Sequence, residues 1–339
     1  MKVLVTGAAG FIGFHLSKSL LEKGHIVIGI DNINEYYDVN LKYARLIELG
    51  IQREDAELFL NSSKGNLHGD AFEFIRMNLQ DRENLPKLFL KQKFDVICNL
   101  AAQAGVRYSI ENPETYVDSN IVGFLNVLEC CRHNNIQHFL FASSSSVYGQ
   151  NTKTPFSEND NVDHPISLYA ATKKSNELMA YTYSHLYNIP TTGIRFFTVY
   201  GPWGRPDMAI YLFADAIFKG KKIKVFNNGN MSRDFTYIDD IISGIDILIK
   251  NKPLKDNDIP AFRISNIGNG KPQPLTAFID AIETAFDVIA KKEYLPMQPG
   301  DVPQTWADTK DLERLGYKST IEIQEGVSNF VKWFKKYHQ

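Results

Sequence analysis

MKVLVTGAAGFIG, residues 1–13, is the stretch that decides the fold. Val3–Val5 is a short apolar run typical of a buried parallel strand, and a helical pattern follows the glycines. Gly7 allows the backbone to turn with a positive φ, and the small Gly10 leaves space for a phosphate. Gly13 lets the helix pack closely on the strand, and the free N–H groups at the helix N-terminus favour an anion. The stretch therefore predicts a strand, a tight turn and a helix that bind a dinucleotide.

The next apolar segment, 25–30, supports this interpretation because it ends in an acid, Asp31, about 20 residues beyond the glycines. An acid at this point accepts hydrogen bonds from the adenosine ribose hydroxyls. It also repels a 2′-phosphate, and no lysine or arginine follows until Lys42. We therefore predict that Asp31 and Asn32 bind NAD rather than NADP. The alternative, a βα turn without a ligand, does not explain the acid.

The composition is ordinary for a soluble globular protein, with 339 residues, 44% of them hydrophobic and 22% charged. The formal net charge of −2 argues against nucleic acid or an anionic membrane as a partner. No apolar run is long enough to span a bilayer and the N-terminus does not resemble a signal peptide, so we expect a cytoplasmic protein. Cys98, Cys130 and Cys131 are expected to be reduced core thiols, and the eight scattered histidines predict no metal site.

Segments of strand and helix character alternate after the first βα unit. We expect strands at 72–79, 95–102, 138–143 and 191–197, and long helices at 116–134 and 165–187. Residues 51–70 are rich in polar residues and predict an irregular surface excursion. The alternation predicts an α/β fold, a Rossmann-type doubly wound parallel sheet that binds ligands at the carboxyl ends of its strands.

The pattern changes beyond Tyr200. The segment 201–208, GPWGRPDM, is rich in turn residues, and an α+β pattern continues to an amphipathic C-terminal helix. We expect residues 1–200 to form the NAD-binding Rossmann domain. Residues 201–339 are expected to form mainly a smaller α+β lobe that binds substrate, with some later segments returning to the first domain.

Tyr169 and Lys173, in the motif YAATK, are four residues apart and share one face of a helix. A phenol is a weak base because its unperturbed pKa is about 10, and a nearby ammonium group is expected to lower that pKa. Upstream, SSSSVYG (143–149) places hydroxyls at the carboxyl end of a predicted strand. A hydroxyl, a tyrosine and a lysine so placed can take a proton from an alcohol while NAD takes a hydride. The pair alone is a common pattern, and its order after the glycine loop and the serine cluster predicts a catalytic site.

Several motifs together carry a resemblance that covers nearly the whole chain. They are TGAAGFIG (6–13), DNINEYYDVNLKYARL (31–46), NLAAQAGVRYS (99–109), DSNIVG (118–123), YAATK (169–173), FFTVYGPWGRPDM (196–208) and RDFTYIDDI (233–241). With them the chain resembles the UDP-glucuronate 4-epimerases of the NAD-dependent epimerase/dehydratase family, a branch of the extended short-chain dehydrogenases/reductases. The resemblance implies NAD-dependent epimerisation of UDP-glucuronate to UDP-galacturonate through a transient 4-keto sugar. This intermediate rotates within the site, so that the hydride returns to its other face.

The resemblance also implies roles for individual residues. Tyr169 is the base, Lys173 is its partner and a ribose ligand, and Ser144 shares the proton. The residues expected to bind the cofactor are Gly7, Gly10, Phe11, Ile12, Gly13, Asp31, Asn32, Asn78, Leu79, Leu100, Ala101, Ala102, Asn120, Tyr169, Lys173, Phe197 and Val199.

The UDP part of the substrate is expected to bind to the later lobe. Arg233, in RDF, is the predicted clamp for the diphosphate, because a guanidinium matches phosphate geometry. The alternative for Arg233 is a surface ion pair with Asp234 or Asp239. Lys224, Val225 and Phe226 are expected to run beside the uracil.

The residues after the catalytic hydroxyl indicate the sugar. The related 4,6-dehydratases have Asp-Glu there, and the UDP-glucuronate decarboxylases have a Glu just before Val-Tyr-Gly, whereas this chain has Ser145 and Ser146. We expect these hydroxyls, with Thr198 and Arg205, to hold the C6 carboxylate of a uronate and so prevent loss of CO₂. The alternative for Arg205 is a loop residue without contact to the substrate.

Other functions remain as alternatives. A UDP-glucose or UDP-N-acetylhexosamine 4-epimerase needs no anion site at C6, and a UDP-glucuronate decarboxylase is the third neighbouring activity. A catalytically silent NAD-binding protein is disfavoured because Tyr169 and Lys173 are both present. The resemblance further implies a homodimer joined by a four-helix bundle of 116–134 and 168–187, and a role in polysaccharide biosynthesis.

Overall fold

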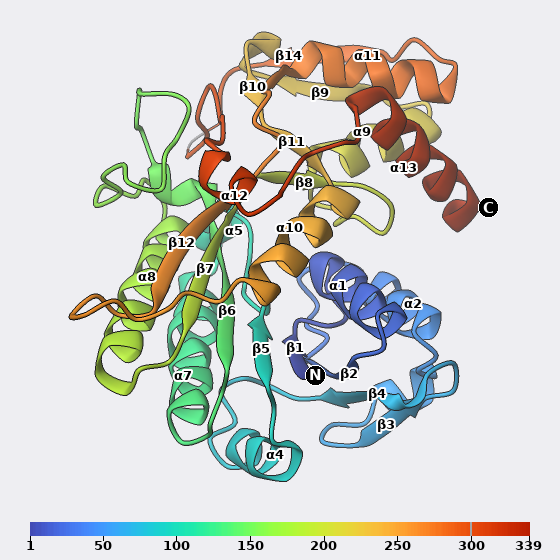
Figure 1. Ribbon diagram of the computed structural model, residues 1–339. Helices are drawn as coiled ribbons and strands as arrows, with labels where there is room; N and C mark the ends of the chain where they lie inside the picture. Colours follow the sequence, from blue (N-terminus) through green and yellow to red (C-terminus); the bar gives the residue numbers. More distant parts are fainter. Residues whose placement is uncertain (299) are drawn as a thin grey trace.

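The strand before the glycines, β1 (Lys2–Thr6), lies inside an eight-stranded sheet (Figure 1). The computed structural model describes residues 1–298 and 300–339 and places the strands in the order β12-β7-β6-β5-β1-β2-β4-β3. Every pair is parallel except β3 with β4. The other strands of the sheet are β2 (Ile26–Asp31), β3 (Ser62–Gly65), β4 (Gly69–Arg76), β5 (Val96–Asn99), β6 (His138–Ser144), β7 (Thr191–Phe196) and β12 (Phe262–Ile267). The predicted doubly wound parallel sheet is confirmed.

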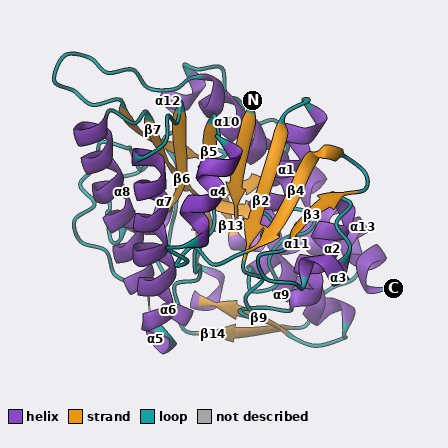
Figure 2. Cartoon of the chain, turned by 90° about the horizontal axis from the view of Figure 1, so that it is seen from below, coloured by secondary structure: helices purple, strands orange, loops and turns teal. Residues whose placement is uncertain are grey.

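Helices cover both faces of the sheet, and the side chains of β1 therefore alternate between two cores. Val3 and Val5 belong to one core and Leu4 to the other, as expected for a strand buried on both faces. The first core includes helices α1 (Phe11–Glu22), α2 (Val39–Glu48) and α10 (Ile238–Lys250). The second includes α4 (Asn84–Gln92), α7 (Phe124–Arg132) and α8 (Leu168–Tyr187), and α7 and α8 lie side by side (Figure 2).

The later part of the chain forms a smaller α+β lobe that lies beyond the carboxyl ends of the central strands (Figure 1). Its strands form two-stranded sheets, β8 with β11, β9 with β14 and β10 with β13. They are β8 (Thr198–Tyr200), β9 (Ile223–Phe226), β10 (Ser232–Arg233), β11 (Phe235–Tyr237), β13 (Gln273–Pro274) and β14 (Lys292–Leu295). The helices are α9 (Ala209–Phe218), α11 (Leu275–Phe286), α12 (Lys310–Glu313) and α13 (Ile323–His338). Two later segments return to the main sheet, since β12 pairs with β7 and α10 packs on α1.

Two expectations about the first domain are wrong. Residues 51–70 are not wholly irregular, because they contain α3 (Arg53–Ala56) and the edge strand β3, which pairs antiparallel with β4. The helix expected over 116–134 is interrupted: α5 (Tyr108–Glu111) and α6 (Pro113–Tyr116) lead into the π-helical turn η1 (Val117–Gly123), and only then does α7 begin. At Gly123 a Cβ atom would lie 2.8 Å from that of Leu79, so the wide turn passes close to the strand end.

Candidate active site

The glycine-rich turn has the geometry that its sequence predicts. Gly7 has φ +72°, and its N–H donates to the Ile30 carbonyl at 2.8 Å, which joins the turn to β2. At Gly13 a Cβ atom would lie 2.0 Å from the Gly7 carbonyl oxygen, so only glycine permits this approach of helix to turn. The turn thus brings the N-terminus of α1 to the carboxyl end of β1, where it can hold a pyrophosphate.

Asp31 ends β2 beside this turn, as predicted. Its carboxylate accepts hydrogen bonds from the N–H groups of Ala9, at 3.1 Å, and Ile33, at 2.8 Å. These two bonds fix the orientation of the carboxylate at the edge of the cavity, where Asn32 also lies. The cradle and the acid together fit a dinucleotide whose ribose has free hydroxyls.

One buried side chain ties the glycine-rich turn to the segment 201–208. Arg45, on α2, donates to the Ala9 carbonyl at 2.8 Å and to the Trp203 carbonyl at 2.7 and 3.1 Å. It also donates to the Tyr37 hydroxyl at 2.8 Å. The cofactor turn and the segment that carries Arg205 are therefore held by the same guanidinium.

A cavity of about 1120 Å³ extends from the glycine-rich turn across the strand ends to the smaller lobe. Most of the predicted site residues line it, in both the cofactor and the substrate groups. They are Gly7, Gly10, Phe11, Ile12, Gly13, Asp31, Asn32, Leu79, Leu100, Ala101, Ala102, Ser144, Ser145, Ser146, Tyr169, Lys173, Phe197, Thr198, Val199, Arg205, Lys224, Phe226 and Arg233. Residues that are far apart in the sequence thus share one site.

Three predicted site residues do not line the cavity. Asn78 is exposed beyond the end of β4, and Val225 is fully buried in the core of the smaller lobe. Asn120 is buried in the π-helical turn, where its side chain accepts from the Gln103 N–H at 2.8 Å and donates to the Gln103 carbonyl at 3.0 Å. Asn120 therefore acts on the cavity through the backbone of Gln103, which does line it.

Tyr169 and Lys173 lie in the first turns of α8, as predicted. The hydroxyl of Ser167 caps this helix by accepting from the Ala170 N–H at 3.1 Å. The Lys173 ammonium lies 5.9 Å from the centre of the Tyr169 ring and donates to the Ala142 carbonyl of β6 at 2.9 Å. The lysine thus connects α8 to β6, the strand that ends in Ser144.

The pKa values of this pair differ from the expectation. Burial raises the pKa of Tyr169, and the nearby Ser144 hydroxyl and Arg205 charge only partly oppose it. Burial also lowers the pKa of Lys173 to about 7, so that this amine is only partly charged near neutral pH. Without the cofactor, the pKa of Tyr169 is therefore not lowered, because both groups are desolvated together; the expectation that it is lowered applies to the site with the positive nicotinamide ring beside Lys173.

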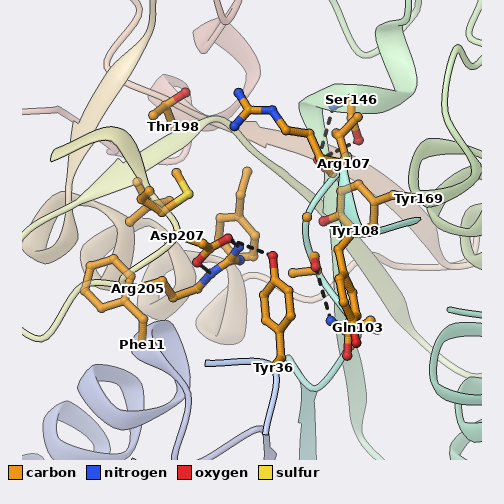
Figure 3. Close-up of a pocket in the computed structure, with 18 of the residues that line it drawn as sticks. Phe11, Tyr36, Gln103, Arg107, Tyr108, Ser146, Tyr169, Thr198, Arg205 and Asp207 are labelled. Atoms are coloured by element: carbon orange, nitrogen blue, oxygen red, sulfur yellow. Dashed lines mark hydrogen bonds and ion pairs between the residues drawn. The ribbon is translucent and has the colours of Figure 1, made fainter. Parts of the chain in front are cut away.

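The serine cluster forms the turn between β6 and the η2 segment (Ser145–Tyr148). Ser144 caps this turn, and its oxygen accepts from the Ser146 N–H at 3.2 Å and from the Ser146 hydroxyl at 2.8 Å. Ser146 and Tyr169 lie close together on the same side of the cavity (Figure 3). The hydroxyls are therefore ordered before any substrate hydroxyl binds.

Arg205 lies on the opposite side of the cavity and already has a partner. Its Nε and Nη2 groups donate to the two oxygens of Asp207, at 3.0 and 2.5 Å. The hydroxyl of Tyr36 donates to the same carboxylate at 3.0 Å (Figure 3). Although burial opposes ionisation, the Arg205 charge and these hydrogen bonds hold the pKa of Asp207 below its usual value.

Arg233 and Arg107 share one carboxylate where the cavity meets the smaller lobe. Arg233 lies 3.6 Å from Asp301, and Arg107 lies 3.5 Å from the same side chain. Arg107 also stands over the ring of Phe226, 5.5 Å from its centre. The partner of Arg233 is thus neither Asp234 nor Asp239. Two guanidinium groups around one acid leave an excess of positive charge for a diphosphate.

Sequence reasoning missed Arg107, Tyr36 and Asp207 as site residues. All three lie inside motifs quoted above, NLAAQAGVRYS, DNINEYYDVNLKYARL and FFTVYGPWGRPDM, and all three line the cavity. The charge of Arg107, in the segment that connects β5 to α5, was a usable signal. The pairing of Tyr36 with Asp207 joins residues 171 positions apart and had none.

The described residues, 1–298 and 300–339, contain no group of three or more His, Cys, Asp or Glu side chains that could hold a metal ion. In the same part of the chain, no helix is both long and apolar enough to cross a membrane. His15 is half-buried, packs against Phe11 and Phe14 and contacts the Pro202 carbonyl at 3.0 Å, and its partial desolvation lowers its pKa to about 4. It therefore packs as a neutral residue.

The parallel sheet, the glycine-rich turn with its acid and the Ser–Tyr–Lys group define a dinucleotide-dependent enzyme of the short-chain dehydrogenase/reductase class. The chain belongs to the NAD dependent epimerase/dehydratase family, whose sequence model matches residues 3–268.

Relatives of known name are similar over the full length. Protein CapI of Staphylococcus aureus is 52% identical over 352 residues, which cover 100% of both chains. A probable UDP-glucuronate 4-epimerase of Rhizobium meliloti is 46% identical over 98% of this chain and 97% of its own. The crystal structure of UDP-glucuronic acid 4-epimerase from Bacillus cereus, in complex with UDP-glucuronic acid and NAD, matches with a TM-score of 0.87. It is 33% identical and covers 99% of this chain and 100% of its own.

Proposed function

We propose that this protein is an isomerase that interconverts UDP-glucuronate and UDP-galacturonate by NAD-dependent 4-epimerisation. The observation that carries the proposal is one cavity that is lined by Tyr169, Lys173 and Ser144 and also by Arg205, which lies on the side opposite Tyr169 (Figure 3). Relatives named for this activity match along the whole chain. The site therefore combines the groups that oxidise and reduce an alcohol with a cation that suits a uronate.

Bound NAD supplies a reversible acceptor for the hydride of the sugar C4. The glycine-rich turn would hold its pyrophosphate and Asp31 its adenosine ribose. Tyr169 takes the proton of the C4 hydroxyl and later returns it, and Ser144 shares that proton through its contact with the phenol. Lys173 positions the phenol and binds the second ribose.

The substrate would bind with its diphosphate between Arg107 and Arg233, and with its uracil beside Lys224 and Phe226. The C6 carboxylate would then reach Ser145, Ser146, Thr198 and Arg205. Neutral hydrogen-bond donors and one cation can hold that carboxylate in a fixed, solvated position, which disfavours loss of CO₂ from the keto intermediate.

The test is the product formed from UDP-glucuronate by the purified protein, read by NMR. The expected product is UDP-galacturonate at equilibrium with its precursor. A UDP-pentose product would assign a decarboxylase, and faster turnover of UDP-glucose would assign a hexose epimerase.

Removing the carboxylate at the end of β2 should weaken the cofactor. We expect the purified protein to carry NAD without any being added, and Asp31→Ala to retain about ten- to a hundredfold less, because charge-assisted hydrogen bonds to the ribose are lost. The measurement is the NAD released on denaturation. Asp70→Ala is the control, since Asp70 is exposed and pairs with Lys64. Tighter binding of NADP than of NAD by the unmodified protein would contradict the assignment.

We also propose that two copies of the protein pair through α8 and its neighbour α7. Leu178, Tyr181 and Leu186 are exposed on α8 by 58, 48 and 57%, which is unusual for large apolar side chains on one helix. A four-helix bundle formed with a second copy would cover them. Light scattering should give the mass of a dimer, and Leu178→Glu should shift it toward the monomer. A monomeric unmodified protein would contradict this arrangement.

The proposed reaction indicates a biological role for this protein. We propose a cytoplasmic location and a role in polysaccharide biosynthesis, because the product is an activated uronate, a donor for glycosyl transfer.

A further inference from the structure

The Arg205–Asp207 pair has an arrangement that a simple anion site does not need. The carboxylate of Asp207 occupies the fork formed by Nε and Nη2 of Arg205, which is the side of a guanidinium best suited to a carboxylate. Both side chains are half-buried, with 24 and 28% exposed. The cation proposed to recognise the uronate is therefore already bound to an acid of the same chain.

Tyr36 holds this acid from the other domain. It follows β2, and its hydroxyl reaches across the cavity to Asp207 at 3.0 Å. The ring packs on Tyr108, with 4.8 Å between ring centres, and the hydroxyl lies against Gly105, where a Cβ atom would push it aside. Tyr36 is thus fixed in place, and its hydrogen bond stabilises the charged form of Asp207.

We propose that Asp207, held by Tyr36, limits how strongly the site prefers a uronate, because it competes with the C6 carboxylate of the substrate for Arg205. This inference rests on the proposed function and adds a residue to it. A neutral sugar has no group that can replace Asp207, so the pair stays closed. A uronate exchanges one carboxylate for another at the same guanidinium.

The competition has a measurable consequence. Because only the fraction of molecules in which Arg205 is free of Asp207 can bind the uronate fully, the apparent dissociation constant is raised by the inverse of that fraction. Asp207→Asn keeps the shape but removes the competing charge. We expect it to bind UDP-glucuronate about fivefold or more tightly, with the affinity for UDP-glucose unchanged within about twofold. If Asp207 merely supported Arg205, the same variant would bind the uronate more weakly.

The experiment is calorimetric titration of the NAD-bound protein with each UDP-sugar, in a Tyr169→Phe background so that the sugar is not turned over. Tyr36→Phe should act in the same direction with a smaller effect, about twofold, and should add nothing to Asp207→Asn if both work through one carboxylate. Asp311→Asn is the matched control, because Asp311 pairs with Arg314 on the surface. Should Asp207→Asn fail to fold, Tyr36→Phe carries the test alone.

Three results would overturn the proposal: weaker or unchanged uronate binding, equal tightening for both sugars, or additive effects of the two substitutions. Epimerase activity of the unmodified protein is measured in parallel. If that protein does not epimerise UDP-glucuronate, the proposed function fails. If it does, and Asp207→Asn does not favour the uronate, only the competition fails.

Discussion

Replacing Tyr169 with phenylalanine should reduce turnover of UDP-glucuronate by about 10²–10⁴-fold. The phenol is the group proposed to take the C4 proton, and no other phenol has Ser144 and Lys173 beside it among the residues described. The ring should remain in place, because it packs edge-to-face on Tyr116 with 6.1 Å between ring centres. The loss should therefore appear in kcat, while the affinity for the UDP-sugar stays within a few-fold.

The measurement is a comparison of steady-state kinetics with calorimetric binding. Tyr187→Phe is the control, since it removes a hydroxyl from the same helix but outside the cavity lining. Activity of Tyr169→Phe within about tenfold of the unmodified protein would place the proton acceptor elsewhere.

Arg205→Ala should have the second-largest effect, and it should depend on the sugar. Leaving a charged group without its partner costs on the order of 1–3 kcal/mol, which corresponds to about ten- to a hundredfold or more in turnover of UDP-glucuronate. The substitution also leaves the Asp207 carboxylate unpaired in the cavity, where it repels the uronate. UDP-glucose has no carboxylate, so its turnover should change little.

Both sugars are assayed on each variant, and release of a UDP-4-keto-pentose is monitored because a loosely held carboxylate can be lost as CO₂. The double variant Arg205→Ala/Asp207→Asn should recover part of the loss, since the repelling charge is removed. Arg314→Ala controls for the loss of a surface Arg–Asp pair. Equal losses on both sugars would mean that Arg205 supports the diphosphate site or the loop, and not the carboxylate.

Local features could be predicted from the sequence because nearby residues determine them. The positive φ of Gly7, the acid at the end of β2 and the shared helix face of Tyr169 and Lys173 each depend on a few adjacent positions. The alternation of Val3, Leu4 and Val5 between two cores likewise follows from strand geometry. These features were sufficient to predict the fold class and the position of Tyr169 and Lys173 on one helix.

Pairings and electrostatics across the cavity could not be predicted in the same way. Asp301 meets Arg233 within the smaller lobe and Arg107 from the segment after β5, and Tyr36 meets Asp207, which lies 171 positions later in the chain. The pKa of Lys173 depends on its burial, which the spacing of YAATK does not specify. The π-helical turn around Asn120 depends on close contact with a strand end, which no local pattern records.

The hydrogen bonds of Arg45 restrict which relatives of this enzyme can exchange segments with it in a chimera. This side chain donates hydrogen bonds to the backbone carbonyls of Ala9, in the turn, and of Trp203, in the segment 201–208. The side chains at those two positions can therefore be exchanged freely as far as this link is concerned. The donor cannot, so a graft that transplants residues 201–208 to alter sugar preference must be accepted by a host that keeps an arginine at the position of Arg45.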